Sequence, residues 1–154
     1  MENRDLKYFM RRREAEIVSV PGPESFRDDD GNVLQLEVKK LMQEEIDKIN
    51  NAYFEREMAM DKKGNPLVFN GEVIWKTKRD PAKASRHLIV EALQYPNLKD
   101  QDMMKFYGVV DVTDMPLKVF SSPEEYSHVV RVIMEVLGLR AKADDKEDLQ
   151  AAKN

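Results

Sequence analysis

The order of hydrophobic and polar positions divides this chain into a strand-rich first half and a helical second half. Residues 16–20 have the composition of a β strand. Residues 25–27 and 33–38 then flank the acidic turn at residues 28–32. The alternation of apolar and polar residues after this Asp-Gly-type turn predicts a β hairpin. A second turn at residues 64–66 opens an apolar stretch interrupted by Asn70-Gly71, which predicts a further, protruding hairpin.

Helical spacing occurs twice within this first half. Residues 5–13 carry apolar side chains at helical intervals, and Asp5 is available as the N-cap. Over residues 41–58 the apolar positions recur at intervals of four, three and four, which predicts one amphipathic helix. Its predicted buried stripe is Met42, Ile46, Ile49 and Tyr53.

From residue 80 onward the signals are helix caps and helix stops. Asp80 followed by Pro81 predicts a helix start, and the apolar stripe that follows continues until Pro96. Asp100 is predicted to cap a short helix that ends at Gly108. Thr113 and Pro116 mark another short turn. Ser122 and Glu125 have the spacing of a capping box, and the helix that they open runs to Gly138.

Strands first and helices second predict an α+β fold, in which N-terminal hairpins and one helix precede a multi-helix half. We expect one domain over residues 1–139, strand-rich at 14–78 and helical at 80–138. Residues 140–154 consist mainly of Ala, Lys, Asp and Glu and lack an apolar stripe. They are therefore predicted to form a charged, disordered tail.

Composition narrows the class of protein. The net charge is −4, from 29 acidic and 25 basic side chains, which gives no general attraction to nucleic acid. The sequence has no cysteine, so disulfides and thiolate metal sites are excluded and a reducing cytoplasm is the expected location. No apolar run approaches the ~20 residues of a membrane span, and the N-terminus lacks a signal-peptide core. No membrane association is expected.

No catalytic, cofactor or metal site is expected from the residue patterns. Placing Gly31 at the sixth position of a calcium loop puts Phe26, which cannot ligate, at the first, so a solvated turn is the better interpretation of the acidic stretch. The two histidines, His87 and His128, do not occur in an HxxxH or HxxE spacing, and no cysteine is present to complete a zinc site. Either could serve as a general base only with a partner from elsewhere in the fold, and no nucleophile motif accompanies them.

Two groups of residues are candidates for partner binding. Arg11, Arg12 and Arg13 form the one concentrated basic patch, expected at the C-terminal end of the predicted first helix, where a solvated helix end is the favoured interpretation and partner docking the second. Met103 and Met104 are adjacent in a predicted helix, so both cannot point fully into one core. A methionine-rich surface suits a protein that binds irregular apolar segments, and nine methionines is a high count for 154 residues.

Three segments together resemble the XkdN-like family of phage tail assembly chaperones from Gram-positive phages and prophages. The resemblance covers most of residues 5–139 in the same order. Its most specific part lies in the helical half. The matching segments are Tyr8 to Asn32, Lys78 to His87, and the set Tyr95-Pro96-Asn97-Leu98, Tyr107-Gly108-Val109 and Pro123-Glu124-Glu125-Tyr126.

The resemblance implies a non-enzymatic function. Members of such a family are expected to bind the long, apolar tape measure protein in the host cytoplasm. They also assist assembly of tail tube subunits around it, and are not expected in the finished virion. The alternative is a structural tail component, such as a tube or completion protein, which would be present in the particle. We infer no property of the hairpin at residues 65–78 from the resemblance.

Many tail assembly chaperone systems also produce a longer product by ribosomal frameshifting. The chain ends in Ala152-Lys153-Asn154, which the codons GCA AAA AAC would encode. That run contains the slippery heptamer A AAA AAC. We therefore hypothesise that a frameshifted, C-terminally extended form exists. The nucleotide sequence of the gene tests this hypothesis.

Overall fold

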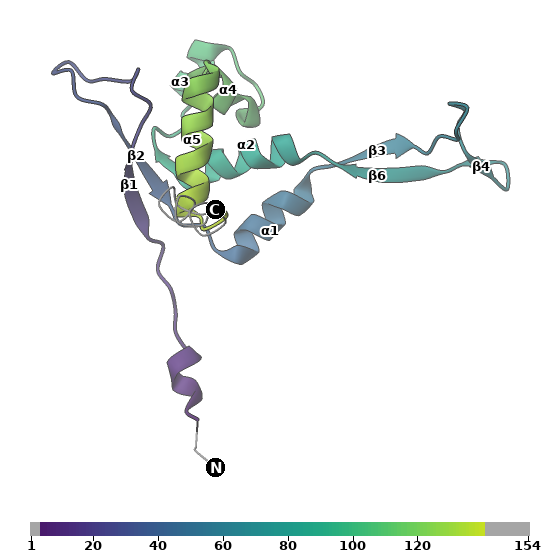
Figure 1. Cartoon of the computed structure of the whole chain (residues 1–154), viewed down its shortest axis with the longest axis horizontal. Coiled ribbons are helices and arrows are strands. Elements are labelled where there is room, and N and C mark those ends of the chain that lie inside the picture. The colour runs from purple at the N-terminus through teal and green to yellow at the C-terminus, as the bar shows by residue number, and fades with distance from the viewer. Residues whose placement is uncertain (1–3, 141–154) are drawn as a thin grey trace, which may run out of the picture.

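A three-stranded antiparallel sheet and a set of helices form the body of the protein, from which two segments project (Figure 1). The computed structural model describes residues 4–140. The predicted α+β class is confirmed, with strands early and helices late. The predicted tail from residue 141 onward, including the Ala152-Lys153-Asn154 end, lies outside the described residues.

The body sheet has the order β1-β2-β7, from strands β1 (Ile17–Pro21), β2 (Gln35–Lys39) and β7 (Leu93–Tyr95). The predicted hairpin around the acidic turn is confirmed in part: β1 and β2 pair antiparallel over their full lengths, whereas residues 25–27 contribute only the isolated bridge from Arg27 to Val33. Leu36 and Val38, two of the predicted alternating residues, are 4% and 0% exposed. One face of the sheet is therefore buried against the helices, as period-two alternation requires.

The acidic turn between β1 and β2 is held by its own side chains. The Asp28 carboxylate accepts hydrogen bonds from the backbone N–H groups of Asp30 at 3.0 Å and Asn32 at 2.9 Å. Gly31 adopts a φ of 83°, which favours glycine, and its carbonyl accepts from the Arg27 guanidinium at 2.8 Å. This stretch is an Asx-type turn.

The predicted helix over residues 41–58 is wrong in its second part. Helix α1 covers Gln43–Ala52, and Ile46 and Ile49 of the predicted stripe are buried. Residues Phe54–Met58 instead form strand β3. The reason is non-local, because these residues pair with a strand that lies far along the chain, and tertiary pairing overrides a local helical spacing.

The second predicted hairpin is confirmed and does protrude. Strand β3 pairs antiparallel with β6 (Trp75–Arg79), and the far end carries a second small ladder of β4 (Val68–Phe69) and β5 (Glu72–Val73). Asn70-Gly71 joins β4 to β5, both residues with positive φ, as a two-residue hairpin turn requires. This ribbon, residues 54–79, extends to the right of the body in Figure 1 and is called the hairpin arm below.

The predicted caps of the second half are confirmed at three helix starts, because the side chains of Asp80, Asp100 and Ser122 each accept from the backbone N–H three residues on. Asp111, which was not predicted as a cap, accepts from the N–H of Thr113 at the start of the next short helix. Gly108 ends the short α3 with a φ of 64°. The elements are α2 (Pro81–Ala92), α3 (Gln101–Tyr107), the 3-10 helix η2 (Val112–Asp114), α4 (Met115–Val119) and α5 (Pro123–Val136).

Two details of the helical half differ from the prediction. Helix α2 ends at Ala92 rather than at Pro96, because Leu93–Tyr95 leave it to pair with β2 as β7. At the start of α5, Ser122 accepts from the backbone of Glu125 at 3.1 Å as predicted. The Glu125 carboxylate, however, accepts from the Ser25 hydroxyl at 3.1 Å, so it ties α5 to the first hairpin.

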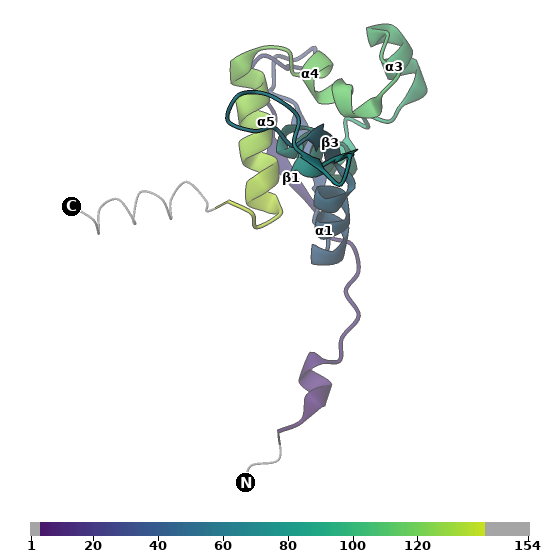
Figure 2. The ribbon, with the colours of Figure 1, turned by 90° about the vertical axis from the view of Figure 1, so that its right-hand side faces the viewer.

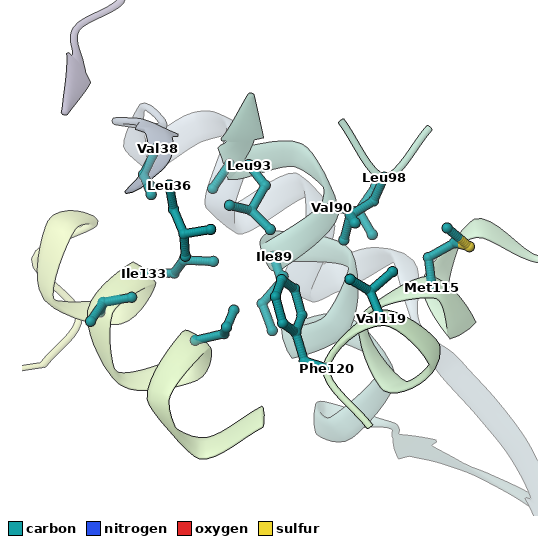
Figure 3. Close-up of a cluster of buried hydrophobic side chains, with 13 residues drawn as sticks. Leu36, Val38, Ile89, Val90, Leu93, Leu98, Met115, Val119, Phe120 and Ile133 are labelled. Atoms are coloured by element: carbon teal, nitrogen blue, oxygen red, sulfur yellow. The ribbon is translucent and has the colours of Figure 1, made fainter. Parts of the chain in front are cut away.

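The main core lies where α2, α4 and α5 meet the buried face of the sheet (Figure 3). A smaller core joins α1 to α2 through Ile46, Ile49 and Leu88. No helix among residues 4–140 is both long and apolar enough to cross a membrane. The main core consists of Leu36, Val38, Ile89, Val90, Ala92, Leu93, Leu98, Met115, Val119, Phe120, Val129, Val132 and Ile133.

Candidate binding surface

The N-terminal segment, residues 4–16, extends away from the body and exposes every one of its side chains (Figures 1 and 2). The predicted helix over residues 5–13 is reduced to a 3-10 helix, η1 (Leu6–Phe9), which Asp5 caps through the N–H of Lys7. So short a helix, without packing against the body, lacks the contacts that stabilise helices in water. The apolar side chains of this segment are therefore presented to solvent.

The placement of Arg11, Arg12 and Arg13 at a helix end is wrong. These arginines follow η1 in extended, irregular chain, so a helix dipole does not act on them. They remain exposed and lie directly after Tyr8, Phe9 and Met10, which are 74%, 84% and 78% exposed. The segment combines exposed apolar side chains with a run of positive charge.

The hairpin arm has two chemically different faces. In an antiparallel ladder, residues directly opposite each other lie on the same face, and the two faces alternate along each strand. Phe54, Arg56 and Met58 of β3 thus share a face with the β6 residues opposite them, Arg79, Thr77 and Trp75. We call this set the apolar face. The other set, here the charged face, consists of Glu55, Glu57, Lys76 and Lys78.

The apolar face is open to solvent. Phe54, Met58 and Trp75 are 47%, 37% and 50% exposed. The guanidinium of Arg56 lies over the Trp75 ring, 5.0 Å from the ring centre, in a cation–π arrangement. Each of these side chains keeps a large part of its surface available for contact with another molecule.

The sequence analysis missed this face because it placed Phe54–Met58 in a helix. The signal that could have found it is weak: Glu55 and Glu57 alternate with the other three residues of the stretch, but Arg56 interrupts the apolar series between Phe54 and Met58. The helical spacing from Ile49 to Tyr53 hid this period-two pattern, because the helical series ends at Tyr53 and the strand begins at the next residue.

Met103 and Met104 lie on α3 and are half-buried. Both pack against the main core, and Met103 also lines a pocket of about 150 Å³ beside Phe26 and Phe120. The more exposed apolar residue of α3 is Phe106, at 81%. A partner that contacts the two methionines would reach only their exposed edges.

His87 lies in the wall of an open pocket of about 330 Å³ between α1 and α2. Its Nε2 is 3.4 Å from the Glu91 carboxylate, and its Nδ1 shares a hydrogen bond with the Tyr53 hydroxyl. Both ring nitrogens are thus engaged, and no serine or threonine is among the described residues that line this pocket. The pairing of a histidine with a carboxylate is present, and the hydroxyl beside it is that of Tyr53 rather than of a serine or threonine.

The charged groups around this pocket shift two pKa values. Burial raises the pKa of the Tyr53 hydroxyl, with help from the Asp111 and Glu91 carboxylates and against the Lys83 ammonium. Partial burial opposes the charge on Glu91, but hydrogen bonds and attraction from Lys99 and His87 outweigh it and lower the pKa of Glu91. These contacts connect α1, α2 and the loop that precedes α3.

His128 has a different role. Its Nε2 donates to the carbonyl oxygen of Pro21 at 2.8 Å, and Arg131 approaches its Nδ1 at 3.2 Å. It therefore fastens α5 to the end of β1. Within residues 4–140, no group of three or more histidine, aspartate or glutamate side chains is arranged to hold a metal ion.

Comparison with known proteins gives a consistent result. The family described as "Phage XkdN-like tail assembly chaperone protein, TAC" matches residues 6–151. In Bacillus subtilis (strain 168), the protein YqbN is 31% identical over 153 residues, which span 97% of this chain and 93% of YqbN. The phage-like element PBSX protein XkdN of the same strain is 28% identical over 153 residues, spanning 97% of this chain and 94% of XkdN.

A solved structure shares the fold. The crystal structure of the protein YqbN superposes with a TM-score of 0.65 at 23% identity, covering 89% of this chain and 98% of that one. The likeness extends over most of both chains, so the arrangement of strands and helices described above is a shared architecture.

Proposed function

Because the chain belongs to the XkdN-like family of phage tail assembly chaperones, we propose that it binds the tape measure protein and assists tail tube assembly without catalysis. The observation that carries the proposal is the exposure of large apolar side chains on two projecting segments. The N-terminal segment presents Phe9 at 84% exposure, and the hairpin arm presents Phe69 at 69%. Exposed apolar patches of this kind mark surfaces for other proteins.

The chemistry of these segments supports binding of an apolar chain. A long apolar protein that is synthesised before its tube exists would aggregate unless its apolar surface were covered. Methionines on the hairpin arm, Met58 and Met60, are flexible enough to pack against irregular apolar side chains. We expect this activity in the cytoplasm of the host cell, with the tail tube protein as a further partner, and absence of the chaperone from the virion.

The test is co-expression with the tape measure protein of the same phage or prophage. We expect the wild-type chain to increase the soluble fraction of that protein and to co-purify with it. If solubility and co-purification are unchanged, the proposal fails. Mass spectrometry of purified particles separates it from the structural-component alternative, which requires this chain in the virion.

The candidate contact residues differ in how cleanly they can be tested. Replacing Arg11, Arg12 and Arg13 together with glutamine changes only exposed side chains, so we expect weaker co-purification with an unchanged thermal midpoint. Met103 and Met104 are proposed contacts as well, but they pack against the core. Their replacement requires a parallel measurement of stability before any loss of binding is assigned to contact.

A further inference from the structure

The apolar face of the hairpin arm is uncovered in a place where a sheet normally has a covering layer. A two-stranded ribbon is only marginally stable in water unless a third strand or a helix packs on it. Here the body sheet and the helices lie at one end of the ribbon only (Figure 1). Every residue of β3 and β6 is exposed, and Trp75 in particular is half-exposed.

The charges on the two faces are distributed unequally. On the charged face, Glu55 lies opposite Lys78 and Glu57 opposite Lys76, so positive and negative groups balance. On the apolar face, Arg56 and Arg79 are the charged groups, and no carboxylate shares that face. Among the described residues neither guanidinium lies within 4.0 Å of a carboxylate. An apolar strip with positive charge along it is complementary to an apolar strip with negative charge along it.

The geometry favours a helix over a strand as the occupant. A strand added to the edge of β3 or β6 would widen the ribbon and leave its apolar face in water, whereas a helix laid on the face would cover it. The two side-chain rows of the ribbon lie about 5 Å apart, so a helix of about 10 Å diameter laid along the ribbon would contact both rows. Five residues of β3 span about 17 Å, which corresponds to about three helical turns.

We propose that the apolar face of the hairpin arm docks an amphipathic helix of about three turns whose apolar stripe is flanked by carboxylates. Phe54, Met58 and Trp75 cover the stripe, and Arg56 and Arg79 pair with the flanking carboxylates. Following the proposed function, this helix belongs to the tape measure protein. The inference adds which surface binds and what kind of segment it binds.

The first experiment uses designed peptides and the full chain. One peptide has a leucine stripe flanked by glutamates, and the other has the same stripe flanked by lysines. Trp75 is the sole tryptophan of the chain, so its fluorescence reports directly on this face. We expect the glutamate peptide to shift the emission to shorter wavelength and to bind at least about tenfold more tightly than the lysine peptide. Equal binding of the two peptides, or no spectral shift, overturns the inference.

The second experiment compares matched variants in co-purification with the tape measure protein. The first double variant, Met58→Thr with Trp75→Thr, removes one pair of opposed residues from the apolar face. The second, Glu57→Thr with Lys76→Thr, removes the adjacent pair from the charged face. Threonine preserves strand propensity in both. We expect about tenfold weaker binding of the first variant and unchanged binding of the second.

A charge-matched pair keeps the inference testable if the threonine variants alter the arm itself. One double variant carries Arg56→Gln and Arg79→Gln, on the apolar face. The other carries Lys76→Gln and Lys78→Gln, on the charged face, so both variants lose the same net charge. We expect only the arginine variant to lose affinity and to lose its preference for the glutamate peptide. If the wild type and all four double variants co-purify equally well with the tape measure protein, this inference is overturned and the proposed function stands. Failure of the wild type to co-purify, with the peptide preference still observed, overturns the proposed function alone.

Discussion

At the scale of single residues, the most connected ionic group described here is Glu91. Its carboxylate is 2.8 Å from the Lys99 ammonium and 3.4 Å from His87 Nε2. These contacts link the last turn of α2 to the loop before α3 and, through His87 and Tyr53, to the end of α1. Because its side chain is 35% exposed, solvent screens the interaction and its contribution to stability is modest.

Glu91→Gln should destabilise the protein in a pH-dependent way. The folded pKa of Glu91 is lowered from its ordinary value of 4.5, so the ionised carboxylate stabilises the fold above that pH. This stabilisation is lost as the pH falls through the folded pKa. We expect the thermal midpoint of the wild type to exceed that of the variant at neutral pH, and the difference to shrink below about pH 4.5.

The control for this prediction is Glu24→Gln. Glu24 is exposed and, among the described residues, has no hydrogen-bonding or ionic partner. Its replacement should leave the midpoint nearly unchanged at every pH. A difference between wild type and Glu91→Gln that does not depend on pH would mean that the carboxylate charge is not the stabilising feature.

At the scale of elements, the helical half is built from helices that begin at side-chain caps. Helix α5 is the largest of them and supplies Val129, Val132 and Ile133 to the main core. Its first turn depends on Ser122, whose hydroxyl accepts from the N–H of Glu125 at 3.1 Å. Fraying of this turn would also loosen the link from Glu125 to the first hairpin.

Ser122→Ala should lower the free energy of unfolding by about 1 kcal/mol, because it leaves a helix N-terminal N–H without its side-chain acceptor. Ser121→Ala, at the exposed neighbouring position, should change it by less than about 0.5 kcal/mol. Urea denaturation of both variants makes the comparison. Equal destabilisation by the two replacements would show that the cap is not what Ser122 contributes.

At the scale of the whole molecule, a packed body carries two exposed segments. The body contains both hydrophobic clusters, whereas the hairpin arm and the N-terminal segment contribute no buried residue to either. Figure 2, which looks along the hairpin arm, shows that the N-terminal segment leaves the body in another direction. The segments that we propose to bind partners are thus separate from the residues that hold the fold together.

Limited trypsin digestion should distinguish these parts. We expect the first cleavages at Arg11 to Arg13 and at Lys62 and Lys63, because these are exposed and lie outside regular structure. The helices of the body should resist longer, since cleavage at Arg86 or Arg131 requires local unfolding of α2 or α5. Mass spectrometry of early fragments identifies the sites. Early cleavage at Arg86 or Arg131 would contradict this division.

The sequence by itself determined the features that depend on neighbouring residues. Asp80, Asp100 and Ser122 were predicted as caps because capping needs only a suitable oxygen beside the first helical N–H groups. The Asn70-Gly71 turn and the burial of Leu36 and Val38 likewise follow from local backbone preferences and alternation.

Tertiary structure alone decided the features that depend on distant parts of the chain. Phe54–Met58 became a strand because Trp75–Arg79 pairs with it, and Leu93–Tyr95 left α2 because β2 offers an edge. The N-terminal helix shortened because the body offers it no surface. Strand register decides which side chains share a face, and so it decides the composition of the apolar face of the hairpin arm. This register is fixed by pairing between residues far apart in sequence.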